Sequence, residues 1–283
     1  MEGDRNNMAG QYDKLFIRGP KPGGTTDYDK RITAIVDDSL LKDSFFFSAM
    51  FMAPQYSTGI KEAHLHPYDE ILFFHGLDPD NPTELGWEMD LFLGDEFIRH
   101  TITRTSIIYL PKQFIHGPLV TRMKKPVFHL FTVFGPTGTL EDFTGTIKQE
   151  GAFEKRYDNY IVSGPKPGQM DTDYKYTTYL DDSIIKGSPY FSSTFISTAN
   201  PFKEETPHSY PYKKILGFFG NNFKDRFNLG AEVEFRIGEK LEKHTFNQST
   251  IVFIPAGLSH CIEKVKINRP FIFVECADNA GLT

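Results

Sequence analysis

Short runs of apolar, aromatic and β-branched residues follow one another along the chain, and clusters of Gly, Pro, Asn and Asp separate them. Such runs are too short for typical helices and have the composition of strands. Five of them lie in the first half of the chain, at residues 45–52, 71–74, 87–93, 105–110 and 126–134. Five more lie in the second half, at residues 191–196, 215–219, 233–237, 250–254 and 270–274. The pattern predicts an all-β sandwich or barrel, with one short connecting helix over 140–153.

The second set of runs resembles the first because the sequence repeats itself at an offset of 144 residues. The offset carries distinctive residues onto identical ones, as for His64 and His208, Gly76 and Gly220, His100 and His244, and His116 and His260. A constant offset over so many positions indicates two copies of one fold. We expect one barrel over residues 13–144 and a second over residues 155–283, each long enough to bury a core of its own.

Composition and charge exclude several classes of protein. With 39% hydrophobic and 24% charged residues, the chain has the balance of a globular protein and not of a disordered one. Its formal net charge of -6 argues against a nucleic-acid surface, which requires a basic patch. No apolar run approaches the roughly 20 residues of a membrane span, and the polar start of the chain lacks a signal-peptide core. Only two cysteines, Cys261 and Cys276, are present and give no disulfide framework, so we expect a cytoplasmic protein.

Four residues of the first copy have the types and spacing of a metal site. His64 and His66 are two residues apart, so on a strand both imidazoles face the same side. Glu70 keeps this parity and returns on the paired strand, while His116 follows the turn that begins at Pro111. Three imidazoles and a carboxylate inside a barrel suit one divalent transition metal: iron first, with manganese, nickel, cobalt or zinc also fitting. A six-coordinate metal would leave two positions open for substrate, water or dioxygen.

This pattern resembles the two motifs of the cupin superfamily. The first is approximately Gly, five residues, His-x-His, three or four residues, Glu, six residues, Gly. The second is approximately Gly, five residues, Pro-x-Gly-x-x-His, three residues, Asn. The matching residues are His64, His66, Glu70, Gly76, Pro111 and His116. Gly59 and Gly76 each lie one residue closer than the motif has them, Gln113 replaces a motif glycine that the second copy keeps as Gly257, and neither copy has the final asparagine.

The resemblance covers nearly the whole chain and implies a bicupin. It implies two tandem cupin-type barrels, also called jelly-roll or double-stranded β-helix barrels, with a metal motif complete only in the first. Cupins commonly pair through their N-terminal strands, so the resemblance also implies a homodimer. The departures from the motifs leave the reaction type open.

In the second copy two of the four metal positions have changed. Tyr210 and Lys214 stand where the first copy has His66 and Glu70, while His208 and His260 remain. One interpretation is a degenerate barrel that supports the first one. The other is a pocket in which Lys214 holds an anion beside Tyr210 and His208. Burial there would lower the lysine pKa, so that a neutral lysine could act as a base.

Further residues are candidates for lining the first pocket. Tyr68 and Phe74 share the strand parity of Glu70, and His129 lies on a late strand of the same copy. They would suit a flat or apolar substrate. His75 has the opposite parity and is expected to point away from the pocket. His100 has a counterpart in the second copy, although that copy lacks the metal set, so we expect a structural role for it.

The ligand set is compatible with several functions, and the sequence assigns no catalytic residue beyond it. The first expectation is a metal-dependent enzyme acting on a small organic molecule, a dioxygenase of an aromatic or enolic compound. The second is a non-redox decarboxylase, lyase or isomerase in which the metal acts as a Lewis acid. The third is a non-enzymatic bicupin that binds a ligand. One fold hosts many chemistries, so the fold alone does not choose among them.

Overall fold

The structure is a computed structural model, and it describes residues 10–19, 31–54, 62–122, 124–142, 156–164, 176–197, 202 and 206–278. Most of both Gly-Pro-Lys-Pro-Gly segments and the motif residue Gly59 lie outside these residues. The described part of the chain is almost entirely β-strand, with three short 3₁₀ helices. Within it, no helix has the length and apolarity that a membrane crossing requires.

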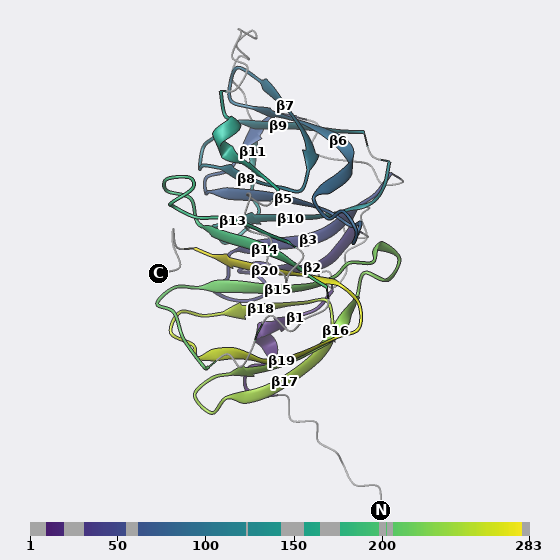
Figure 1. The fold of residues 1–283 in the computed structure, drawn as a ribbon. Coiled ribbons are helices and arrows are strands. Elements are labelled where there is room, and N and C mark those ends of the chain that lie inside the picture. Colours follow the sequence, from purple (N-terminus) through teal and green to yellow (C-terminus); the bar gives the residue numbers. More distant parts are fainter. Residues whose placement is uncertain are drawn as a thin grey trace, which may run out of the picture.

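Two sheets form the first barrel, shown in blue and teal in Figure 1. The larger sheet contains five strands of the first half: β2 (Ile32–Val36), β3 (Phe46–Met52), β5 (Glu70–Gly76), β8 (Ser106–Leu110) and β10 (Val127–Val133). The other sheet contains β4 (His64–Leu65), β6 (Glu84–Leu93), β7 (Ile98–Arg104), β9 (His116–Arg122) and β11 (Glu141–Asp142). All the strand pairs in both sheets are antiparallel.

The second barrel repeats this arrangement in green and yellow. Its larger sheet contains β13 (Tyr176–Leu180), β14 (Tyr190–Ile196), β15 (Lys214–Gly220), β18 (Thr250–Ile254) and β20 (Phe271–Ala277). Its smaller sheet contains β16 (Asn228–Ile237), β17 (Glu242–Gln248) and β19 (His260–Ile267), and the short helix η3 (Phe223–Asp225) precedes β16. The all-β prediction is confirmed, and each predicted strand run overlaps an observed strand. The helix predicted over 140–153 is wrong at its start, where β11 pairs with β4; residues 143–153 lie outside the described ones.

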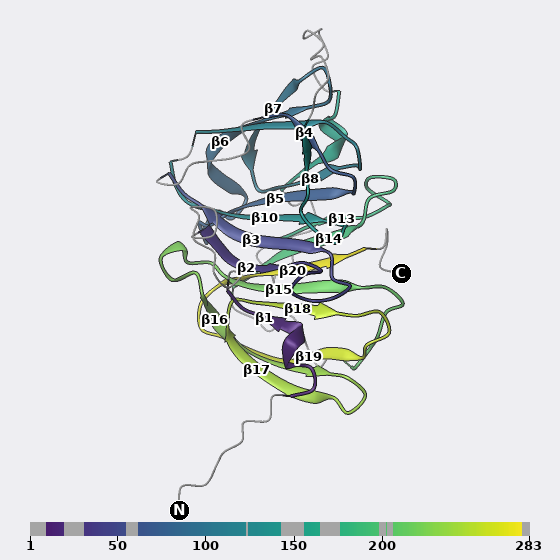
Figure 2. The ribbon, with the colours of Figure 1, turned by 180° about the vertical axis from the view of Figure 1, so that it is seen from behind.

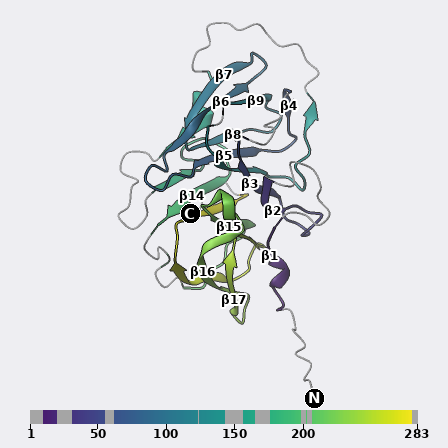
Figure 3. The same cartoon turned by 90° about the vertical axis from the view of Figure 1, so that its right-hand side faces the viewer.

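Each half of the chain lends a short arm to the barrel of the other half. The first arm contains helix η1 (Asp13–Leu15) and strand β1 (Phe16–Ile17), and β1 pairs with β18 of the second barrel. The second arm contains helix η2 (Asp158–Tyr160) and strand β12 (Ile161–Ser163), and β12 pairs with β8 of the first barrel. Figure 3 shows β1 beside the green strands of the second half. The division at 13–144 and 155–283 stays a prediction, because residues 143–155 are not described.

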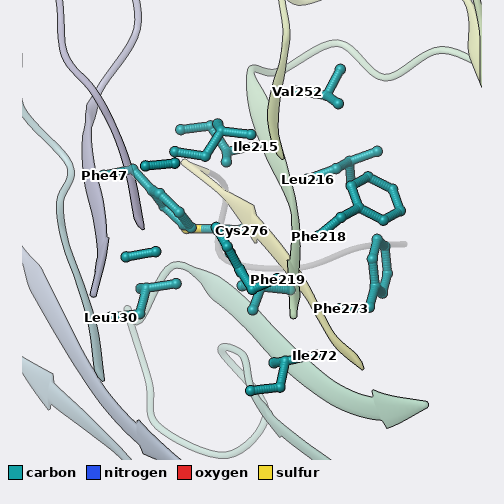
Figure 4. Close-up of a cluster of buried hydrophobic side chains, with 14 of the residues drawn as sticks. Phe47, Leu130, Ile215, Leu216, Phe218, Phe219, Val252, Ile272, Phe273 and Cys276 are labelled. Atoms are coloured by element: carbon teal, nitrogen blue, oxygen red, sulfur yellow. The ribbon is translucent and has the colours of Figure 1, made fainter. Parts of the chain in front are cut away.

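The larger sheets of the two barrels pack against each other, and their facing side chains form one continuous core. The view from behind shows β3 and β2 next to β20 and β15 (Figure 2). Phe219 of β15 lies 6.3 Å from Phe47 and 5.2 Å from Phe128, measured between ring centroids. Figure 4 shows Phe47 and Leu130 of the first half beside Phe219 and Cys276 of the second. Both cysteines are buried, and neither forms a disulfide bond.

Candidate metal centre

The four candidate ligands come from three neighbouring segments of the first barrel. His64 begins β4 and pairs directly with His116, the first residue of β9. His66 follows β4, and Glu70 begins β5. One nitrogen from each of the three histidines lies within 4.8 Å of the others. Each of the four side chains is only 3% exposed, so the topology gathers them in the interior, as their strand parity predicted.

Backbone carbonyls fix the orientation of all three imidazoles. The Nδ1 atoms lie 3.2 Å from the Glu62 oxygen for His64, 2.7 Å from the Thr139 oxygen for His66, and 2.9 Å from the Phe114 oxygen for His116. A carbonyl only accepts, so each Nδ1 carries the proton and donates it. In the neutral form of each ring, Nε2 is then the atom that presents a free lone pair. Holding the second ring nitrogen in this way is the usual support of a metal-binding histidine.

Glu70 completes the donor set. Its Oε2 atom lies 3.3 Å from Nε2 of His66 and 3.0 Å from Nε2 of His116. These three atoms and Nε2 of His64 are buried and have no hydrogen-bond partner. Buried polar atoms without partners are costly, and four of them converging on one point fit a divalent cation.

The protonation states at this centre suit metal binding. Burial, followed by the nearby His116, lowers the pKa of His64 to about 4, so its imidazole is neutral at pH 7. Burial acts to raise the pKa of Glu70, but its interactions with His116, His66 and His64 outweigh burial and leave the pKa below the usual value. A neutral imidazole and an ionised carboxylate are the forms that bind a metal ion.

Side chains beyond the ligands give the interior of the first barrel an aromatic wall. His129 pairs in register with Phe74, so both lie on the Glu70 face of the sheet, and their rings stack at 4.3 Å. Burial lowers the pKa of His129 to about 4, and its Nδ1 donates to the Phe73 oxygen at 3.0 Å. Trp87, which the sequence analysis missed, is 4% exposed and lies 6.4 Å from Phe74. Trp87 lies on the buried side of β6, where buried and exposed residues alternate, and this alternation is the sequence feature that could have identified it.

Tyr68, a pocket-lining candidate, and His75, which was expected to point away, both lie outside this interior. Tyr68 lies in the turn before β5, is 40% exposed and packs its ring against Gly135. His75 faces away from the ligands, as its parity predicted, and lies 5.6 Å from the ring of Phe195 in the second barrel.

The second barrel has an ion pair at the position equivalent to the candidate ligand Glu70. His208 and His260 remain neighbours, with ring centroids 4.6 Å apart and Nδ1 atoms bonded to backbone carbonyls. The Lys214 ammonium lies over the ring of Tyr210, 4.3 Å from its centroid, and forms a salt bridge with Glu275. Glu275 was missed because its counterpart at the offset of 144 is Phe131. Relative to the first barrel, Lys214 thus replaces the candidate ligand Glu70, and Glu275 replaces Phe131 and neutralises the lysine.

The paired histidines outside both pockets hold the exchanged arms. His100 of β7 lies 3.1 Å from Asp158 of the second arm, and His244 of β17 lies 3.2 Å from Asp13 of the first arm. His244 also lies 2.8 Å from Glu242. This gives His100 and His244 the structural role expected for them.

Comparisons with known proteins agree with this architecture. No protein-family model and no curated protein sequence matches the chain. Among solved structures, a mutant of oxalate decarboxylase from Bacillus subtilis matches with a TM-score of 0.58 and 12% identity, over 88% of this chain and 73% of that chain. The oxalate decarboxylase of Lactobacillus farciminis, solved as a formate complex, matches with a TM-score of 0.57 and 12% identity, over 88% and 82%. At this identity the likeness establishes the fold alone: the chain has the bicupin fold, two tandem cupin-type barrels.

Proposed function

We propose that this protein is a metal-dependent bicupin enzyme acting on a small organic substrate in its first barrel. His64, His66, Glu70 and His116 would hold one divalent transition metal. The observation that carries the proposal is the convergence of three lone-pair nitrogens and one carboxylate oxygen, all buried and without hydrogen-bond partners. Iron, manganese, nickel, cobalt and zinc all suit this donor set.

A bound metal would supply Lewis-acid chemistry, polarising a carboxylate or enol oxygen of the substrate. The chain's own residues would orient the metal ligands and keep water away from the substrate. The carbonyls of Glu62, Thr139 and Phe114 hold the imidazoles in place, so that little reorganisation is needed on binding. Phe74 and Trp87 offer apolar surface, and the neutral His129 offers Nε2 as an acceptor for a hydroxyl or N–H group.

Of the reaction classes, a non-redox decarboxylase or related lyase has the better support. The similar solved structures are oxalate decarboxylases, one of them in complex with formate. A dioxygenase of an aromatic or enolic compound is the second candidate, favoured by the aromatic wall that Phe74, Trp87 and His129 provide. A ligand-binding bicupin without turnover is the third.

Two assays on protein purified without added metal separate these functions. Decarboxylation of oxalate with uptake of one proton gives one CO₂ and one formate, with no net consumption of dioxygen. A dioxygenase instead consumes one O₂ per turnover, which an oxygen electrode detects with catechol or a 1,3-diketone as probe. Product formation from oxalate that His116→Ala abolishes would support the first candidate. Stoichiometric O₂ uptake would replace it with the second, and binding without turnover would favour the third.

For the second barrel we propose a supporting role. The cation of Lys214 is already neutralised by Glu275, which weakens the case for an anion site beside Tyr210 and His208. Among the residues that the structure describes, no histidine and carboxylate trio with metal-ligand spacing lies in this pocket.

A further inference from the structure

One loop of the first barrel contacts two of the candidate ligands through its backbone. The turn after Pro111 closes with a hydrogen bond from the Phe114 nitrogen to the Pro111 oxygen, at 3.0 Å. The Gln113 nitrogen donates to the backbone oxygen of His66 at 2.7 Å, and the Phe114 oxygen accepts from Nδ1 of His116 at 2.9 Å. A shift of this loop would therefore turn the His116 ring and displace its Nε2.

Two tyrosines of the exchanged second arm pack on this loop. The ring of Phe114 lies 5.1 Å from Tyr157, edge to face, and 5.3 Å from Tyr160. The two tyrosines stack on each other at 6.0 Å. Aromatic pairs at these separations contribute about 0.5–1.5 kcal/mol each beyond the area that they bury. We call Phe114, Tyr157 and Tyr160 the aromatic clamp.

The arm that carries the two tyrosines is itself fixed to the first barrel. The Tyr157 hydroxyl donates to Glu96 at 2.8 Å, and its ring lies on Gly94, where a Cβ atom would find no room. Asp158 is held by His100, and β12 continues the sheet beside β8. The tyrosines therefore form a firm support for Phe114, even though they follow it in the sequence by more than forty residues.

The second barrel has the same loop without the clamp. His260 Nδ1 lies 3.0 Å from the Leu258 oxygen, and the Gly257 nitrogen donates to the Tyr210 oxygen at 2.7 Å. Leu258 is the counterpart of Phe114 at the offset of 144, and Leu15 of the first arm is the counterpart of Tyr160 at the offset of 145. The aromatic pair thus occurs only beside the complete ligand set.

We propose that Tyr160 and Tyr157, contributed by the second half of the chain, are positioning residues for the metal ligand His116 and act through Phe114. The inference rests on the proposed metal site. Its physical basis is that the clamp holds the Phe114 carbonyl, and this carbonyl sets the ring orientation of His116. Loss of a group that orients a metal ligand typically weakens metal affinity about 10- to 100-fold.

The test is the affinity of the metal-free full-length protein for Co²⁺, measured by visible absorption and by competition with a chelator. Tyr160→Leu and Phe114→Leu install the leucines found at the equivalent positions beside the second barrel, and we expect each to weaken Co²⁺ binding at least about tenfold and to change the absorption spectrum. Tyr160→Phe keeps the ring and should bind within about twofold of the unaltered protein by the same reasoning. Tyr12→Leu removes the counterpart of Tyr157 from the other arm and serves as the matched control; its affinity should not change.

Melting of each variant in chelator separates positioning from general destabilisation. The proposal requires that Phe114→Leu and Tyr160→Leu lose affinity while their metal-free forms stay folded, and that their combined effect is less than additive. Wild-type affinity in Tyr160→Leu and Phe114→Leu would overturn the inference and leave the proposed function intact, and so would an equal loss in Tyr12→Leu. An unaltered protein that binds no Co²⁺ would overturn the proposed function as well.

Discussion

Burial keeps several histidines of this protein neutral. It lowers the pKa of His75 to about 3 and those of His64, His129 and His260 to about 4. At pH 7 a ring whose Nδ1 donates to a carbonyl therefore presents an unprotonated Nε2, which is the form that both a metal site and a hydrogen-bond acceptor require. The same burial lowers the free energy of unfolding in acid, because the unfolded chain binds protons on these rings more readily than the folded chain does.

His75 allows this cost to be measured away from the ligands. Its folded pKa of about 3 lies below the unfolded value of 6.5, so the unfolded chain binds the proton first. The stability that it contributes is complete above pH 6.5 and is lost as the pH falls toward 3. From pH 7 to pH 5 one such group costs about 2 kcal/mol. We predict that His75→Phe, which installs the residue found at the equivalent Phe219, flattens the fall in unfolding free energy over this interval by about that amount.

Chemical denaturation at a series of pH values checks the prediction. If the plots of unfolding free energy against pH are parallel for His75→Phe and the unaltered protein, this histidine does not cause the loss of stability in acid. His100→Phe provides a control of the same chemical change at a buried histidine that is paired with the Asp158 carboxylate, and a smaller effect is expected there.

At the scale of elements, the sequence predicts what alternation and repetition can encode. The two-residue spacing of His64 and His66 places both rings on one side even though β4 is only two residues long. Strand β7 was missed because its apolar residues, Ile98 and Ile102, are separated by polar ones and form no continuous apolar run. The arm exchange was missed too, because nothing local in Asp13–Leu15 or Asp158–Tyr160 specifies a partner in the other half.

The ion pair between β15 and β20 is another contact between distant segments that the sequence did not predict. Lys214 and Glu275 are distant in sequence, and only the alignment of the copies, which sets Glu275 against Phe131, hinted at a compensating change. We predict that Glu275→Phe destabilises the fold by about 3 kcal/mol, because it leaves a buried ammonium without its counterion. The side chain of Lys214 is 3% exposed and that of Glu275 is 18% exposed, which favours the lower end of the usual range.

A double-mutant cycle measures this pair. Lys214→Met combined with Glu275→Phe removes both charges and should regain most of the lost stability, since replacing a buried ion pair by apolar side chains is often close to neutral. If the losses of unfolding free energy in the two single variants, measured with urea, simply add in the double variant, the two side chains do not stabilise each other.

At the scale of the whole molecule, the two barrels share one hydrophobic core and exchange two arms. Each half therefore depends on the other for part of its core and of its sheet. The arrangement bears on assembly. Strand β1, which the resemblance would use for a homodimer, pairs with β18 inside the chain. A homodimer stays a prediction, and its contact surface is expected to lie away from β1. Multi-angle light scattering checks it: twice the mass of one chain is expected, and the mass of a single chain at high concentration would contradict it.

The account depends most on the claim that the first barrel alone binds the metal. Glu70→Gln keeps the shape of the side chain but removes its charge, and His116→Ala removes a ligand; neither should prevent folding, and both should lose the metal. The matched changes are Lys214→Gln, whose amide can still donate to Glu275, and His260→Ala.

Elemental analysis of these four variants and the unaltered protein, all purified without added metal, is the most direct measurement. We expect one equivalent of a divalent transition metal per chain in the unaltered protein and in both second-barrel variants. Metal content should fall close to zero in Glu70→Gln and His116→Ala. Full metal content in those two variants, or loss of metal in Lys214→Gln or His260→Ala, would place the metal in the second barrel and contradict the account.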